Sequence, residues 1–293
     1  MDSVKKRSTP YVFLLPTLTI MLILIVVPII LVVGYSFFDN VIVNQNPQFV
    51  GLRHYIANLQ NDVFWIAVRN TLFFVVLSVV FHMILGMAFA LLLNTRYLSS
   101  ATKAVFRILY VLPWLFTASV IAILWRLMLH PHGMINYLIA MFNIYDGQIA
   151  WLSSRQFALM AVTFINIWAG YPFFMISILA GLQGISSDLY EASSIDGAGA
   201  IKQFFHIIIP QLKPILISLA MLGFVWTTHQ FAIIWMTTGG GPVNATHVLS
   251  THVYIQAFSR NQFALASSSA TLVLIVCTVV AIFYVRHQKA GDH

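Results

Sequence analysis

Residues 70–94 read NTLFFVVLSVVFHMILGMAFALLLN, which is 25 residues without a single Asp, Glu, Lys or Arg. About 20 consecutive apolar residues are enough for a helix to cross the hydrocarbon core of a bilayer. A segment surrounded by lipid must also satisfy its own backbone hydrogen bonds, and a helix does so within the segment. The stretch therefore predicts a membrane-spanning helix and decides the class of fold.

Five further apolar runs flank this one, at residues 11–34, 105–129, 157–180, 212–237 and 264–285. Each of them is long enough to cross a bilayer as a helix. The first run is too long for the core of a signal peptide and no A-x-A cleavage site follows it, so we expect an uncleaved helix, kinked at Pro16 and Pro28. The sequence therefore predicts an all-α, polytopic membrane protein with six transmembrane helices.

The composition of the whole chain supports this class. Hydrophobic residues make up 60% of the 293 residues and charged residues only 8%, whereas about 25% of a soluble domain is charged. The net charge of +7 does not indicate nucleic-acid binding, because the basic residues sit at the edges of the apolar runs and not on one polar face with interleaved aromatics. Cys277 is the one cysteine, which excludes a disulfide or a cysteine-based metal site within the chain.

The distribution of Lys and Arg predicts the orientation of the helices. With the N-terminus inside, ten basic residues fall on the inner side: Lys5, Lys6, Arg7, Arg96, Lys103, Arg107, Lys202, Lys213, Arg286 and Lys289. Five fall on the outer side: Arg53, Arg69, Arg126, Arg155 and Arg260. By the positive-inside rule, this asymmetry places both termini in the cytoplasm. We expect a cytoplasmic tail at 1–10, a transmembrane domain at 11–286 and a second cytoplasmic tail at 287–293.

The longest inner segment, residues 181–211, carries helix signals of its own. Ser187 and Asp188 are candidate N-caps, and Glu191 follows at roughly the spacing of a capping box. A short helix is therefore expected over residues 188–195.

A turn at Gly197 and Gly199, with a positive φ at Gly197, is expected to end this helix, and a second short helix over 200–209 is expected to stop at Pro210. Such a helix–turn–helix either lies on the membrane as an amphipathic connector or docks into a partner protein. Lipid-binding interfacial helices are usually basic. Three of the eight acidic residues lie here instead, which favours docking: Asp188, Glu191 and Asp196.

The same segment resembles the EAA loop of ABC importer permeases. The family pattern is roughly E-A-A-x-x-D-G-A, followed by an aromatic residue and then I-x-L-P. The residues that match it are Glu191-Ala192-Ser193, Asp196-Gly197-Ala198, Phe204, Ile207, Ile209 and Pro210. Ser193 replaces an alanine of the pattern and Ile209 replaces its leucine, and both changes are small or conservative.

The resemblance extends over nearly the whole chain and is specific to the sugar branch of the family. Phe49-Val-Gly-Leu-Arg-His-Tyr resembles the outer segment F-V-G-L-x-N-Y, with His54 in place of the asparagine. Asn166-Ile-Trp-Ala-Gly-Tyr-Pro and Thr238-Gly-Gly-Gly-Pro are similar to that branch too. Together these segments resemble F-type maltose permeases without their extra N-terminal helices and large periplasmic insertion.

The resemblance implies an ABC type I importer permease fold in a bacterial inner membrane, with a cytoplasmic EAA coupling loop at about 181–211. It also implies a second permease subunit, two ATPase subunits that bind ATP and Mg, and an extracytoplasmic solute-binding protein that delivers a sugar. The residues that would couple to the ATPase are Glu191, Ala192, Asp196, Gly197 and Ala198. The chain contains no G-x-x-x-x-G-K-[ST] phosphate loop, so we expect a transport subunit that is not an enzyme and has no cofactor of its own.

Two helix faces carry residue types that suit a sugar. The fourth run supplies one face and the fifth run the other, at the same spacing of i, i+3, i+4 and i+7: Asn166, Ala169, Gly170, Phe173, and Gly223, Trp226, Thr227, Gln230. Amides exchange hydrogen bonds with hydroxyls, and rings cover the apolar CH face of a sugar. Packing between helices explains amides and small residues equally well. The resemblance favours the sugar, because these stretches line its site in the maltose-type permeases.

Other functions find less support. A channel or secondary carrier needs a selectivity motif or an ionisable relay, and the runs contain no central carboxylate and no T-V-G-Y-G filter. An intramembrane hydrolase needs a motif such as H-E-x-x-H or G-x-S-x-G, and neither occurs. His82 and His229 lie at membrane depth, and His229 suits hydrogen-bonded packing better than ligand contact. His130-Pro131-His132 lacks a third ligand for a metal.

Overall fold

The computed structural model describes residues 13–95 and 97–290, and the side chains of these residues except 287–290. Regular structure in this part of the chain is helical, and its β pairing is limited to a bridge between Phe38 and Phe49. The prediction of an all-α fold is therefore confirmed. The tail at 1–10 and Arg96, which contribute to the predicted inner charge, lie outside the described residues.

The helices follow one another with short connections. After a helical stretch at 13–21 they are η1 (Leu22–Val26), α2 (Val27–Tyr35), α3 (Arg53–Leu59), α4 (Asp62–Asn94), α5 (Ser100–Leu115), α6 (Ala118–Met128), α7 (Met134–Met141), α8 (Ala158–Gln183), α9 (Ser187–Ile195), α10 (Ala200–Gln203), η2 (Phe204–Ile208), α11 (Ile209–Thr228), α12 (Ala232–Thr237), α13 (Leu249–Tyr254), η3 (Ile255–Ser259) and α14 (Phe263–Ala290). The label η marks a π-helical turn.

Five helices of the described chain are long and apolar enough to cross a membrane: Phe13–Tyr35, Asp62–Asn94, Ala158–Gln183, Ala200–Thr228 and Phe263–Arg286. A sixth span is obtained when α5 and α6, which are bent by 98° relative to each other, are counted together. All six predicted runs thus correspond to apolar helices, but two of them differ in shape from what the sequence predicts.

The third run is broken in the middle, where a continuous helix was expected. Phe116 and Thr117 adopt extended backbone angles between α5 and α6. Pro113 lies inside α5 and cannot donate a backbone hydrogen bond, while the Thr117 side chain accepts from Val120 N at 3.4 Å and caps the new helix. A proline followed by a threonine cap therefore divides this run.

The fifth run also differs from its predicted course. Pro210 was expected to end a separate short helix, but the chain stays helical from Ala200 to Thr228. The π-turn η2 ends two residues before the proline, and Ile209 N bonds to Phe204 O, five residues back. This wider turn accommodates a residue that has no N–H. At the other end, the helix stops at Thr228 and resumes as α12 at Ala232.

The chain forms two compact units, and the first consists of the segments up to Phe64 and His252–Val276. Its centre is a buried polar network in which Asn58 Nδ2 donates to Ser268 Oγ at 2.7 Å and Gln256 Nε2 donates to Asn58 Oδ1 at 3.0 Å. Ser269 Oγ donates to the oxygen of the Gln256 amide at 2.8 Å. Buried polar groups stabilise a fold only when they are paired, and this network joins α3, η3 and the start of α14.

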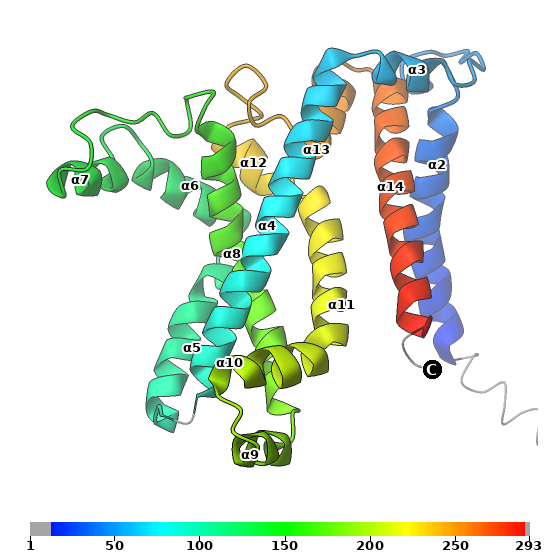
Figure 1. Ribbon diagram of the computed structural model, residues 1–293. Coiled ribbons are helices and arrows are strands. Elements are labelled where there is room, and N and C mark those ends of the chain that lie inside the picture. Colours follow the sequence, from blue (N-terminus) through cyan, green and yellow to red (C-terminus); the bar gives the residue numbers. More distant parts are fainter. Residues whose placement is uncertain (1–12, 96, 291–293) are drawn as a thin grey trace, which may run out of the picture. The chain divides into compact units, whose positions relative to one another are not determined.

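The second unit, Trp65–Thr251 with the segment from Cys277, has α8 at its centre. In α8, 61% of an apolar stretch of 18 residues is buried inside the structure, compared with 28% of such a stretch in α4. Helices α5, α6, α11 and α12 pack on α8, and hydrogen bonds join it to α4. Figure 1 shows α9 beyond the end of α8, followed by the long helix that begins with α10. A buried central helix places its polar residues where several other helices meet.

Candidate functional site

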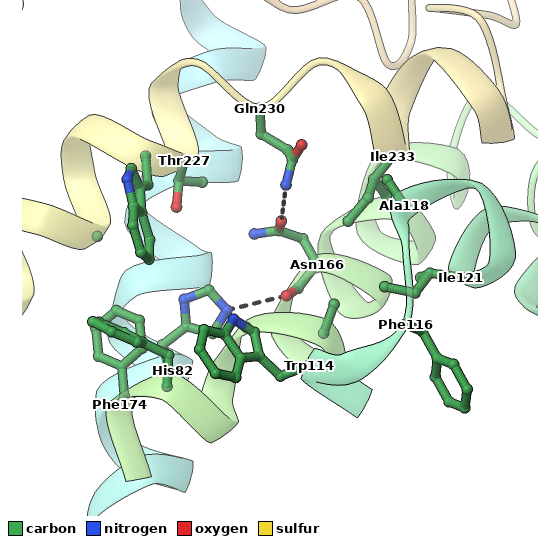
Figure 2. A pocket seen from close by; sticks show the side chains of 15 residues that line it. His82, Trp114, Phe116, Ala118, Ile121, Asn166, Phe174, Thr227, Gln230 and Ile233 are labelled. Carbon is green, nitrogen blue, oxygen red and sulfur yellow. Dashed lines mark hydrogen bonds between the residues drawn. The ribbon is translucent and has the colours of Figure 1, made fainter. Parts of the chain in front are cut away.

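A cavity of about 320 Å³ lies within the second unit, between α8 and the helices that surround it. All eight residues of the two candidate faces line it: Asn166, Ala169, Gly170, Phe173, Gly223, Trp226, Thr227 and Gln230. The helical spacing read from the sequence therefore brings the two faces together around one space (Figure 2).

Asn166 is the polar centre of the cavity wall and is only 5% exposed. Its Nδ2 donates to Ser78 Oγ on α4 at 3.0 Å, and its Oδ1 accepts from Gln230 Nε2 at 3.2 Å. Its backbone oxygen pairs with His82 Nε2, also on α4, at 3.1 Å. Asn166 thus joins three segments of the chain, as a packing residue does. It also lines the cavity, where it can contact a ligand.

Gln230 reaches the cavity because α11 ends before it. The helix stops at Thr228, and Gln230 follows in the break before α12. Figure 2 shows its side chain pointing from this break toward Asn166. Its Nε2 carries the bond to Asn166, and no described residue forms a hydrogen bond with its amide oxygen. This amide therefore retains hydrogen-bonding capacity that a ligand can use.

Three aromatic rings from three helices cover one side of the cavity. Phe173 on α8 lies between Trp114 of α5, at a centroid distance of 6.0 Å, and Trp226 of α11, at 5.1 Å. Rings at these distances contact each other directly. The cavity thus combines a wall of amides with a wall of rings.

The two candidate glycines make room for neighbouring rings. A Cβ on Gly170 would collide with Nε2 of His82 and would lie 2.7 Å from its Cε1. A Cβ on Gly223 would lie 2.8 Å from Cζ of Phe174. The space beside each glycine is therefore taken by a side chain of the cavity wall, which is the packing role that the sequence left open.

Several lining residues were not found from the sequence: His82, Trp114, Phe116, Ala118, Ile121, Phe174 and Ile233. Trp114 lies in the last turn of α5 and Phe116 in the break that follows, and Pro113 is the sequence signal that could have revealed this break. His82 was expected at membrane depth but without a role. Its place in the wall depends on how α4 packs on α8, which spacing along one helix does not reveal.

The coupling residues lie on α9 and in the turn that follows it. Glu191, Ala192, Asp196 and Gly197 are exposed and Ala198 is half-buried. The N-cap of α9 is Ser186, whose Oγ accepts from Asp188 N at 3.3 Å, and not Ser187 or Asp188 as expected. Ser186 has the extended backbone that an N-cap needs, whereas Ser187 is already helical.

Gly197 ends α9 with a left-handed backbone conformation, at φ +77°. Ala198 N bonds to Ser193 O at 2.9 Å and Gly197 N bonds to Ser194 O at 3.1 Å. This pair of bonds is a Schellman motif, in which glycine is preferred at the left-handed position. The expectation of a positive φ at Gly197 is confirmed.

A side-chain clamp holds α9 against α10. Gln203 Nε2 donates to Ser193 Oγ at 2.9 Å and to Ser194 Oγ at 3.0 Å, so the serine that replaces the alanine of the family pattern bonds across the turn. Tyr190 on the same helix is half-buried, and burial raises the pKa of its hydroxyl above the usual range. The α9–α10 hairpin is therefore a defined structural element.

No group of three or more His, Cys, Asp or Glu side chains in the described chain is placed to hold a metal ion. In the His130-Pro131-His132 segment, His130 Nδ1 accepts from the backbone N–H of His132 at 3.2 Å. His132 Nδ1 lies 3.1 Å from Gln148 Nε2, so both rings take part in local loop bonds.

Comparisons with known proteins agree with this architecture. The family model described as "Binding-protein-dependent transport system inner membrane component" matches residues 82–290, more than half of the chain. "Probable ABC transporter permease protein YurN" of Bacillus subtilis is 31% identical over 288 residues, which cover 98% of each chain. "Trehalose/maltose transport system permease protein MalF" of Thermococcus litoralis is 32% identical over 283 residues, which cover 96% of this chain and 94% of that protein.

A solved structure has the same fold. It is a chain of a bacterial alginate ABC transporter in complex with a periplasmic protein that holds an alginate pentasaccharide. The TM-score is 0.83 at 22% sequence identity, and the match covers 97% of this chain and 94% of the other.

Proposed function

Because the chain belongs to the family of binding-protein-dependent transport system inner membrane components, we propose that it carries a sugar across the membrane through the cavity beside α8. The chain is a multi-pass membrane permease of the ABC transporter type. A di- or oligosaccharide, or a related glycoside, is the proposed substrate. Transport is into the cytoplasm of a bacterial cell, and both termini lie on the cytoplasmic side of the inner membrane.

One observation carries the proposal for a sugar. The cavity lies among membrane-spanning helices, and its walls combine the amides of Asn166 and Gln230 with the rings of Trp114, Phe173 and Trp226. Amides match hydroxyls, which both donate and accept hydrogen bonds, and rings match the apolar CH face of a pyranose. A purely apolar substrate would leave the amide oxygen of Gln230 without a partner, which is costly in a low-dielectric interior. A MalF relative named for trehalose and maltose supports the same class of substrate.

The family and the exposed surface of α9 support a proposal for the partners. We assign to this chain a second permease subunit, two ATPase subunits that bind ATP and Mg, and an extracytoplasmic solute-binding protein. The α9–α10 hairpin docks on the ATPase through Glu191, Ala192, Asp196, Gly197 and Ala198. At its tip Ile195 is 87% exposed and Ile201 is 76% exposed, beside these acidic side chains. Apolar side chains with an acidic rim suit a protein cleft better than an anionic lipid surface.

The test is ATP-driven uptake by the whole complex. The chain is purified from cells that also produce its partner subunits and is reconstituted into liposomes. The solute-binding protein and a panel of radiolabelled sugars that includes trehalose and maltose are then added. We expect an ATPase and a second permease to co-purify, and at least one sugar to enter only when ATP is supplied. Sugar uptake by the chain alone, driven by an ion gradient, would instead identify a secondary carrier and contradict the proposal.

A further inference from the structure

His82 is held in the cavity wall by three contacts. Its Nε2 pairs with the Asn166 backbone oxygen at 3.1 Å, and its ring stacks on Phe174 with a centroid distance of 4.9 Å. The edge of the ring fills the space beside Gly170, where a Cβ would collide with it. The residue is 3% exposed, so the orientation of its ring is fixed by the surrounding helices.

These contacts determine which ring nitrogen carries the proton in the neutral form. A carbonyl oxygen can only accept, so Nε2 must donate to Asn166. Nδ1 of the neutral ring is then an acceptor with a free lone pair. Within the described residues, Nδ1 is buried and has no hydrogen-bond partner. Buried polar atoms in native proteins are nearly always paired, so an unpaired acceptor in a cavity wall requires an explanation.

The position of Nδ1 supplies that explanation. His82 lines the same cavity as Thr227 and Gln230. Figure 2 shows the second ring nitrogen on the side of the ring away from the Asn166 carbonyl, on the side of Thr227. Nδ1 itself is buried, so a hydroxyl that reaches it from the cavity must displace a neighbouring side chain of the wall. It can then donate a hydrogen bond to Nδ1 while the bond at Nε2 is kept.

We propose that Nδ1 of His82 accepts a hydrogen bond from one hydroxyl of the transported sugar and thereby helps to select the substrate. This inference rests on the proposed function, since it needs a sugar in the cavity. A site that must pair a buried acceptor discriminates strongly against an analogue that lacks the matching hydroxyl.

Two substitutions separate this role from packing. The amide nitrogen of a glutamine can take the place of Nε2, so His82→Gln keeps the bond to the Asn166 carbonyl and removes the acceptor at Nδ1. An asparagine is shorter and places its amide near Nδ1, so His82→Asn keeps an acceptor there and loses the bond to Asn166. His229→Gln is the matched control, because His229 directly follows α11, pairs back with Val225 O at 2.9 Å and does not line the cavity.

The measurement is made on the reconstituted complex. ATP-driven uptake is compared for the parent sugar, which is trehalose or maltose, whichever the wild type takes up, and for the monodeoxy analogues of that sugar. The wild type should take up one analogue about tenfold more slowly than the parent sugar, as expected for one lost hydrogen bond. The His82→Gln variant should take up the parent sugar about tenfold more slowly than the wild type does, and it should take up the parent sugar and that analogue at the same rate. The His82→Asn variant should keep most of the wild type's preference for the parent sugar over the analogue. The solute-binding protein is the same in every sample, so its own preference cancels in the comparison.

The outcomes distinguish the inference from its premise. Loss of discrimination in His82→Gln alone, with His229→Gln unchanged, supports the contact. The reverse pattern, in which His82→Gln behaves as wild type and His82→Asn fails, would show that His82 only joins α4 to α8. It would leave the proposed function intact. Absence of ATP-driven sugar uptake by the wild type would overturn both.

Discussion

Asn166 and Gln230 share a hydrogen bond but differ in what else they hold. Asn166 is buried and joins α8 to Ser78 and His82 on α4, while Gln230 sits in a helix break and makes one side-chain bond. Replacing a buried group leaves its partners unpaired, and that penalty exceeds the net value of the bond. The two residues should therefore respond differently to the same substitution.

We expect Gln230→Ala to lower sugar uptake about tenfold with little change in the melting temperature of the complex, since a lost amide contact costs about 1–3 kcal/mol when its partner is left unpaired. Asn166→Ala should lower both uptake and the melting temperature, because Ser78 loses its partner as well. Uptake and thermal unfolding are measured on the same preparations. Normal uptake by both variants would mean that these amides serve packing alone.

The glycine at 170 gives a second prediction for a single residue. Gly170→Ala places a methyl group against the His82 ring, and overpacking of this kind costs about 1–3 kcal/mol. Gly34→Ala is the matched control, since a Cβ at Gly34 meets nothing within 4 Å. The first variant should lower the melting temperature and the yield of the complex, and the second should not. Equal behaviour of the two would show that the ring moves aside without cost.

At the scale of elements, the hairpin of α9 and α10 depends on its turn. A Cβ added at Gly197 or at Gly199 would meet nothing within 4 Å, but only Gly197 of the two has a positive φ, at +77°. A left-handed conformation costs a non-glycine residue about 1–2 kcal/mol. The two glycines are therefore a matched pair in which crowding is equal and only backbone conformation differs.

We predict that Gly197→Val and Glu191→Lys abolish ATP-driven uptake, while Gly199→Val retains most of it. The reason is that, in the proposed function, the turn and the acidic surface of α9 dock on the ATPase partner. Sugar-stimulated ATP hydrolysis and a pull-down of the ATPase subunit are the measurements. Membrane insertion and binding-protein docking should be preserved in every variant. Full stimulation in Gly197→Val or Glu191→Lys would reduce the hairpin to a connector on the membrane surface.

The spacing of residues along single helices was enough to predict much of the cavity wall. It could not predict which residues of different helices contact each other. The spacing of Asn166, Ala169, Gly170 and Phe173 selects one face of α8 because an α-helix returns to the same side every three or four residues. His82 was missed as a wall residue because its position depends on a stack with Phe174 and on the gap left by Gly170. The bend between α5 and α6 was missed because both helices are apolar. The mean hydropathy of the whole run stays high, although Pro113 and the Thr117 cap divide it.

For the whole molecule, the distribution of charge bears on orientation. Ten basic residues against five favour an N-terminus inside, and the number of spans then puts the C-terminus on the same side. We predict that a reporter fused after His293 is cytoplasmic and that one inserted near Asp146 is extracytoplasmic. Alkaline phosphatase and green fluorescent protein fusions in intact cells measure this directly. An extracytoplasmic C-terminus would contradict the counting of α5 and α6 as one span.

The most direct test of the account asks whether a transported sugar enters the cavity beside α8. In a Cys277→Ala background, Gln230→Cys puts a thiol in the cavity wall, and His229→Cys puts one beside it but outside the wall. Alkylation of each thiol by a small reagent is followed in the reconstituted importer, with and without trehalose or maltose, whichever the wild type takes up. The account predicts that the sugar protects the thiol at 230 during turnover and leaves the thiol at 229 unprotected. Equal alkylation at 230 with and without the sugar would contradict it.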